Sequence, residues 1–282
     1  MREKTTGAAA LAASQSFYLP LHEQEPYADI ALLRDVRYGA DERHHLDVFT
    51  TTQSLSTLRP VLLFVHGGGF TGGDKKRPGL PYQDNVGLWA ARHGVVGVNM
   101  TYRLAPQHRW PAVVEDVAAA VAWAKGNVAA HGGDPARIFL MGASAGATHA
   151  ASFIARQVPD KTADLAGGIL VSGAYDLTLG DPGDSARSYF GDDASRHAAS
   201  SPFEGLLASP VPLMVAIAEY DPPKLEAQAL HLINAFHDRR KTLPAFTRLM
   251  GHNHFTTTHH LNTGDEYFGL QILRFMDLQA AE

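Results

Sequence analysis

The sequence contains no cysteine among its 282 residues. Disulfide bonds, a thiolate nucleophile and a zinc site built from cysteine are therefore excluded. No stretch approaches the roughly 20 consecutive apolar residues that a membrane-spanning helix needs. The net charge is −5 at pH 7 and no basic run occurs, so neither nucleic acid nor an anionic membrane is expected as a partner.

Residues 1–13 have a weak likeness to a secretory signal, because a charged start precedes an alanine-rich stretch. That stretch is short and only weakly hydrophobic. We therefore interpret it as the start of a surface helix and expect a cytoplasmic protein.

Short apolar runs alternate with segments of helical period along most of the chain. The runs are apolar almost throughout, which is typical of strands in a parallel sheet covered by helices on both faces. The runs predicted as buried strands are 61–65, 95–100, 138–141, 168–172, 211–217 and 246–249. Helices are predicted over 85–93, 111–124 and 267–278, and the alternating segments 31–38 and 45–50 predict a hairpin at a sheet edge.

Two segments depart from this rhythm. Residues 1–29 form a mixed, partly helical lead-in, and residues 179–208 are rich in Gly, Asp, Ser and Ala without a clear period. We expect a single α/β domain over residues 1–282, a length that such folds often reach, with these two segments as lid elements above the strand ends.

Residues 142–146 read G-A-S-A-G and follow the apolar run 138–141, while small residues suited to a closely packed helix come after them. A serine on a sharp strand-to-helix turn is held in strained backbone, and side chains two positions away would collide with neighbouring chain. Gly142 and Gly146 remove those side chains. The context predicts Ser144 as a nucleophile, and the simpler alternative is a glycine-bounded turn with an exposed serine.

Residues 66–70 read H-G-G-G-F and follow the apolar run 61–65. Glycines allow main-chain N–H groups to face a ligand without side chains in the way, although a flexible connecting loop would look the same. In serine hydrolases a further N–H comes from the residue after the nucleophile, which is Ala145 here. Together these groups would stabilise an oxyanion.

A serine nucleophile also needs a base and a carboxylate that orients the base. Glu219 and Asp221 follow the predicted strand 211–217, and His252 and His254 follow the predicted strand 246–249. The chain order Ser, acid, His is therefore available. The residues by themselves leave both pairs open.

H-G-G-G-F at 66–70, Y-R-L-A-P at 102–106 and G-A-S-A-G at 142–146 resemble the α/β-hydrolase fold. More narrowly, the chain resembles the hormone-sensitive-lipase-like esterases and the related short-lid carboxylesterases and arylformamidases, from about residue 60 to the end. The resemblance implies an α/β-hydrolase fold with a mostly parallel central sheet, helices on both faces and a small lid.

The resemblance also selects residues. It implies Gly68 and Gly69 as oxyanion donors beside Ala145, and it gives His66 a supporting part in the loop. The family has Asp before Pro after the late strand, which implies Asp221 as the orienting acid with Glu219 second. It ends the last loop in His-Phe, which implies His254 as the base with His252 second.

No cofactor and no catalytic metal are expected. The sequence has no H-E-x-x-H, and the adjacent pairs at 44–45 and 259–260 cannot easily point at one ion. The 259–260 pair is expected in the next helix, as surface or core-edge histidines. Aromatic residues of the lead-in and lid, namely Phe17, Tyr18, Tyr189 and Phe190, either line the cleft or pack.

The predicted function is a serine carboxylesterase that acts on small-molecule esters with small to medium acyl groups, since the lid resembles that of short-lid esterases. One alternative is hydrolysis of an amide, formamide or carbamate by the same residues. A second is a ligand-binding protein on an inactive hydrolase scaffold, although candidates for all three triad members are present. A homodimer is left open.

Overall fold

The computed structural model describes residues 4–53, 57–155 and 164–277. Residues 1–3 of the N-terminal segment and residue 278, where the last predicted helix ends, lie outside the described residues. The chain forms an eight-stranded sheet in the order β1-β2-β4-β3-β5-β6-β7-β8. The strands are β1 (Ile30–Arg37), β2 (His45–Thr51), β3 (Arg59–Val65), β4 (Val96–Met100), β5 (Gly133–Ala143), β6 (Gly167–Val171), β7 (Leu213–Tyr220) and β8 (Ala245–Asn253).

β1 and β2 form the antiparallel edge hairpin that the sequence predicts, and the remaining strands from β4 to β8 run parallel. β3, β4 and β6 are buried along their whole length. This explains why their sequences are apolar throughout and do not alternate.

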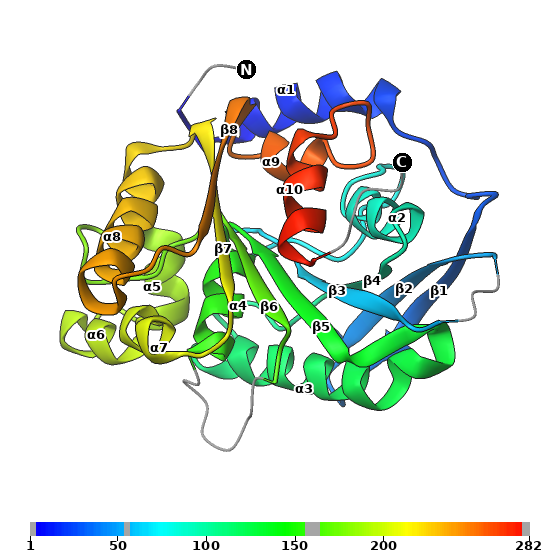
Figure 1. The fold of residues 1–282 in the computed structure, drawn as a ribbon. Helices are drawn as coiled ribbons and strands as arrows, with labels where there is room; N and C mark the ends of the chain where they lie inside the picture. The colour runs from blue at the N-terminus through cyan, green and yellow to red at the C-terminus, as the bar shows by residue number, and fades with distance from the viewer. Residues whose placement is uncertain (1–3, 54–56, 156–163, 278–282) are drawn as a thin grey trace.

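Helices cover both faces of the sheet (Figure 1). On one face pack α3 (Ala112–Asn127), α4 (Ala145–Ile154) and α8 (Pro223–Arg240), and on the other pack α2 (Asp84–Arg92) and α10 (Tyr267–Phe275). The sequence predicted α2, α3 and α10 but not α8. Because α8 buries only five side chains and carries polar residues on most of its surface, its apolar period is weak.

The two segments predicted as lid elements are largely helical. The lead-in holds α1 (Ala8–Tyr18), and the later segment holds α5 (Asp184–Phe190), α6 (His197–Ser200) and α7 (Phe203–Ala208). α1 crosses above the carboxyl end of β8 and lies beside the short helix α9 (Thr256–His259) in Figure 1. No helix in the described ranges is long and apolar enough to cross a membrane.

Candidate active site

Ser144 lies in the turn between β5 and α4, at the N-terminus of the helix. Its φ of 55° and ψ of −124° form a backbone conformation that side-chain-bearing residues rarely adopt. A Cβ atom at Gly142 would lie 2.2 Å from the carbonyl oxygen of Gly146, and one at Gly146 would lie 2.1 Å from the carbonyl oxygen of Val65. Neither position can carry a side chain, so both glycines are needed for this turn.

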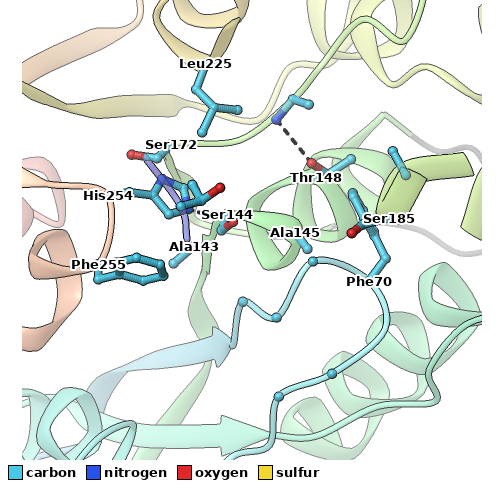
Figure 2. Close-up of a pocket in the computed structure, with 18 of the residues that line it drawn as sticks. Phe70, Ala143, Ser144, Ala145, Thr148, Ser172, Ser185, Leu225, His254 and Phe255 are labelled. Carbon is cyan, nitrogen blue, oxygen red and sulfur yellow. Dashed lines mark hydrogen bonds between the residues drawn. The ribbon is translucent and has the colours of Figure 1, made fainter. Parts of the chain in front are cut away.

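Ser144, His254 and Asp221 form a continuous line of hydrogen bonds. His254 Nε2 is 2.9 Å from Ser144 Oγ, and His254 Nδ1 is 2.8 Å from Asp221 Oδ1. An ionised carboxylate can only accept, so Nδ1 carries the imidazole proton and Nε2 accepts from the serine hydroxyl. Figure 2 shows Ser144 and His254 next to each other at the cavity. The structure thus brings together Ser144, which the motif predicted, and Asp221 and His254, which the resemblance selected.

The second carboxylate oxygen of Asp221, Oδ2, accepts two further hydrogen bonds. Ser172 Oγ donates to Asp221 Oδ2 over 2.6 Å, and the amide of Ala218 donates to the same oxygen over 2.7 Å. Asp221 has no solvent exposure. Sequence reasoning missed Ser172. The available signal was its position as the polar residue that ends the apolar run 168–172, directly after β6, which pairs with the strand that precedes Ser144.

The two second-ranked residues point elsewhere. Glu219 Oε2 accepts a hydrogen bond from the Gly251 amide over 2.7 Å. His252 directs Nδ1 toward the carbonyl of Thr256 at 3.2 Å and Nε2 toward Asp265 at 3.1 Å. Neither side chain contacts the line of hydrogen bonds that ends at Ser144.

The glycine loop brings free amides close to Ser144. Gly68 has φ +145° and Gly69 has φ +60°, and a Cβ atom at Gly68 would lie 1.9 Å from the carbonyl oxygen of Gly72. Within the described parts of the chain, the amides of Gly68, Gly69 and Ala145 donate to no protein acceptor. Ala145 is the first residue of α4, where the amide has no partner inside the helix.

Hydrogen bonds of the His66 side chain stabilise this glycine loop. Its Nδ1–H donates to the Gly67 carbonyl over 2.7 Å, and its Nε2 accepts from the Thr101 hydroxyl at 3.1 Å. Tyr102 stacks on the ring at 4.3 Å between centroids and donates to the His66 carbonyl. Burial lowers the pKa of His66 to about 4, so the ring stays neutral at pH 7.

A cavity of about 530 Å³ opens over Ser144, and both segments predicted as lid elements contribute to its wall. The lead-in contributes Thr6 and Leu11, and the later segment contributes Leu179, Asp181, Pro182, Ser185 and Ala186. Phe255 and Leu225 stand on the opposite side from Phe70 in Figure 2. Apolar side chains therefore form part of the wall on both sides of the cavity.

The four aromatic residues considered as cleft residues do not line this cavity. Tyr189 is buried and stacks on Phe70 with the rings 7° from parallel and 5.6 Å between centroids. Phe190 packs edge-on against Phe70. Tyr18 is also buried, while Phe17 is mostly exposed. Of the two roles left open for these residues, packing is the one that fits Tyr18, Tyr189 and Phe190.

His259 ends α9 and His260 follows it, and both are buried, so of the two positions left open for these histidines the surface is wrong. His259 lines the cavity, and burial lowers its pKa to about 3. His260 joins His252 and Asp265 in a group whose nitrogen and oxygen atoms all lie within 4.8 Å of one another. No motif in the sequence signals this group, because its residues are separated by several positions and converge only where the chain folds back.

Comparisons with known proteins agree with this architecture. A family model described as the alpha/beta hydrolase fold matches residues 62–242. The chain therefore belongs to the α/β-hydrolase fold family. Among solved structures it is similar to esterase B from Lactobacillus rhamnosis, with a TM-score of 0.76, 18% identity, and coverage of 96% of this chain and 93% of that one. At that identity the likeness shows the fold.

Two curated relatives come from Mycobacterium tuberculosis. The esterase LipC is 39% identical over 113 residues, which are 40% of this chain and 27% of LipC. The esterase LipQ is 29% identical over 272 residues, covering 88% of this chain and 63% of LipQ. The chain thus spans less than two thirds of the length of these relatives.

Proposed function

We propose that the protein is a serine carboxylesterase that hydrolyses esters with small to medium acyl groups and needs no cofactor for the chemistry. The observation that carries the proposal is the hydrogen-bonded line from Asp221 through His254 to Ser144, which opens into a cavity beside three unpartnered amides. The names of LipC and LipQ as esterases support the same reaction class.

In the first half-reaction, Ser144 Oγ attacks the ester carbonyl carbon while its proton moves to His254 Nε2. The carbonyl oxygen becomes an oxyanion and accepts hydrogen bonds from the amides of Gly68, Gly69 and Ala145. His254 then donates its proton to the departing alcohol oxygen as the carbon–oxygen bond breaks. This leaves an acyl group on Ser144.

In the second half-reaction, water takes the place of the alcohol. His254 accepts a proton from the water, whose oxygen attacks the acyl carbon, and returns that proton to Ser144 Oγ as the acid leaves. Asp221 remains ionised throughout and stabilises the imidazolium that forms twice in the cycle. Ser172 and the amide of Ala218 fix the carboxylate and so fix the ring.

The cavity supports the choice of substrate size. Its volume of about 530 Å³ is within the range that accommodates small molecules, and its wall contains the apolar side chains of Leu11, Leu179 and Leu225. We assign the two wall-forming segments, within residues 1–29 and 179–208, the role of lid elements of the single domain. A cytoplasmic location and a homodimer stay predictions.

Reaction with a fluorophosphonate followed by peptide mass mapping tests the proposal. We expect one phosphonate per chain, on Ser144, and no labelling of the Ser144→Ala variant. Absence of labelling in the folded protein would favour a ligand-binding role. A parallel assay with an aryl acetate and its matching anilide tests the bond type, and turnover of the anilide alone would assign the residues to amide hydrolysis.

A further inference from the structure

A second cluster of histidine and aspartate lies behind the loop that carries His254. His252 is the next-to-last residue of strand β8, His260 follows α9, and Asp265 precedes α10. One ring nitrogen of each histidine and one carboxylate oxygen lie within 4.8 Å of one another. The proposed esterase chemistry uses none of these three side chains.

One backbone carbonyl sets the orientation of both rings. The oxygen of Thr256 accepts from His260 Nδ1 at 2.6 Å and lies 3.2 Å from His252 Nδ1. A nitrogen that donates to a carbonyl carries the ring proton, so the opposite nitrogen of His260, Nε2, presents a lone pair. His252 Nδ1 lies equally close to the Thr256 hydroxyl, at 3.2 Å, and its Nε2 faces the Asp265 carboxylate at 3.1 Å. Binding of an ion at His252 Nε2 would therefore displace the proton that this nitrogen donates to Asp265. A backbone acceptor behind Nδ1 is also the arrangement that commonly supports metal-bound histidine.

The Nε2 atom of His260 is the unexplained feature of this cluster. The side chain has no solvent exposure, and its Nε2 has no hydrogen-bond partner among the described residues. Burying a polar atom without a partner costs free energy, so such an atom calls for a ligand. An ion pair between His252 and Asp265 would account for two side chains of the cluster and would leave His260 Nε2 unsatisfied.

We propose that His252 Nε2, His260 Nε2 and Asp265 Oδ2 bind a divalent transition-metal ion, of which Zn²⁺ fits the donors best. Two neutral imidazoles and one carboxylate are a common zinc ligand set, with water in the fourth position. The ion gives the orphaned nitrogen of His260 its partner.

The spacing is compatible with a tetrahedral ion. Metal–ligand distances of about 2.0–2.1 Å place tetrahedral ligands about 3.3 Å apart. His252 Nε2 and Asp265 Oδ2 are 3.1 Å apart, close to that value. One donor atom of each of the three residues lies within 4.8 Å of the other two, and the side chain of Asp265 is 42% exposed, so it can move toward His260 and leave room for the water.

The ion would have a structural role and would take no part in the reaction. It would join the end of β8 to the segment before α10, on both sides of the turn that contains His254. Thr257 Oγ1 lies in the segment between the proposed ligands, residues 252–265, and donates to the His254 carbonyl over 2.8 Å. Metal binding would therefore stabilise the loop that holds His254 in position.

Metal titration of the full chain, without an affinity tag and after treatment with a chelator, tests the proposal. We expect calorimetry with Zn²⁺ to show one ion per chain and a Tm increase that saturates at one equivalent. Co²⁺ in place of Zn²⁺ should give the visible absorption of a tetrahedral site. In Asp265→Asn and His260→Gln the affinity should fall at least about tenfold.

The matched control is Asp238→Asn. Asp238 contacts His237 at 3.4 Å, and both side chains are exposed, so this pair offers the same residue types without convergence. Affinity should be unchanged in this variant. Absence of stoichiometric binding, or equal affinity in Asp265→Asn and the unaltered chain, would overturn the proposal. Because the side chain of Asp265 is partly exposed, we expect Asp265→Asn to fold. This variant therefore tests the metal site even where His260→Gln does not fold.

Discussion

Two histidine–aspartate pairs begin only two residues apart in the chain and differ in almost everything else. His254 and Asp221 are 2.8 Å apart, and both side chains are buried. His252 and Asp265 are 3.1 Å apart, and the side chain of Asp265 is partly exposed to solvent. The free nitrogen of His254 faces a serine hydroxyl in a cavity, whereas the other nitrogen of His252 faces a backbone carbonyl. The third partner, more than the pair itself, therefore determines what each pair can do.

The divergence of the two histidines has a local cause. Residues two apart in a strand face the same side, but β8 ends at Asn253, between the two rings. Asn253 Oδ1 accepts from the amides of Phe255 and Thr256 at 3.1 Å each, which turns the chain immediately after the strand. His254 is consequently directed over the sheet edge toward Ser144, while His252 is directed toward α9.

Replacement of the reacting residues should have the largest effect. We expect Ser144→Ala and His254→Ala each to lower kcat for an aryl acetate by about 10⁴-fold or more, because nucleophile and base act as one unit. The double variant should be scarcely slower than either single variant. Steady-state kinetics of the three proteins check this, with circular dichroism as the control for folding. Retention of a tenth of the activity in either single variant would show that the residue is wrongly assigned.

The variant Asp221→Asn should show the next largest loss of activity. The amide keeps the shape of the side chain but removes the charge that favours the correct imidazole tautomer and the imidazolium, a loss of about 10³ to 10⁴-fold in kcat. Ser172→Ala should cost about tenfold, because one of two hydrogen bonds to Oδ2 disappears while the Ala218 bond remains. Measurement of kcat for both variants gives the ranking. A smaller loss in Asp221→Asn than in Ser172→Ala would contradict it.

The sequence predicted the parts of this site that local chemistry dictates. Gly142 is required by the turn itself and Gly146 by the close approach of β3, and both glycines flank Ser144 in a short motif, so the motif by itself was enough to locate the turn. The choice between His252 and His254 needed the resemblance, since it depends on where β8 ends. Most element boundaries lay within a few residues of the prediction. The exceptions are β5, which begins at Gly133 where the prediction began at 138, and β8, which extends to Asn253 where the prediction ended at 249.

Long-range convergence was the part that the sequence did not reveal. Ser172 reaches Asp221 across 49 positions, and His260 reaches His252 and Asp265 only because α9 is a single short turn. The amphipathic pattern was too weak to reveal α8. Each of these features depends on tertiary packing, which neither periodicity nor a short motif encodes.

His149 extends the comparison to a histidine with no polar partner. Both of its ring nitrogens lack a hydrogen-bond partner among the residues that the structure describes, and Phe70, Tyr102 and Tyr189 contact the ring. Burial lowers its pKa to about 3, below the value near 6.5 of an unfolded chain. Between these two pH values the unfolded state binds more protons than the folded state. The contribution of neutral His149 to the free energy of unfolding is therefore complete above about pH 6.5 and is lost as the pH falls toward 3.

At pH 5 this one group should have cost the protein about 2 kcal/mol of unfolding free energy relative to pH 8. We expect His149→Phe to reduce the difference in stability between pH 8 and pH 5 by about that amount. Urea denaturation of both proteins at the two pH values measures it, and any packing change cancels because it acts at both. An equal pH dependence in variant and parent would show that His149 is not buried in neutral form.

Glu219→Gln should have the smallest effect and provides the carboxylate counterpart of the comparison. Glu219 lies two residues before Asp221, as His252 lies two residues before His254, yet its Oε2 accepts only from the Gly251 amide near the surface. Glutamine keeps an oxygen that can accept this bond, so kcat/KM should stay within about threefold of the parent and the Tm within a few degrees. Kinetics and thermal denaturation alongside Asp221→Asn check both values. Collapse of activity in Glu219→Gln, together with near-normal activity in Asp221→Asn, would make Glu219 the residue that orients the base.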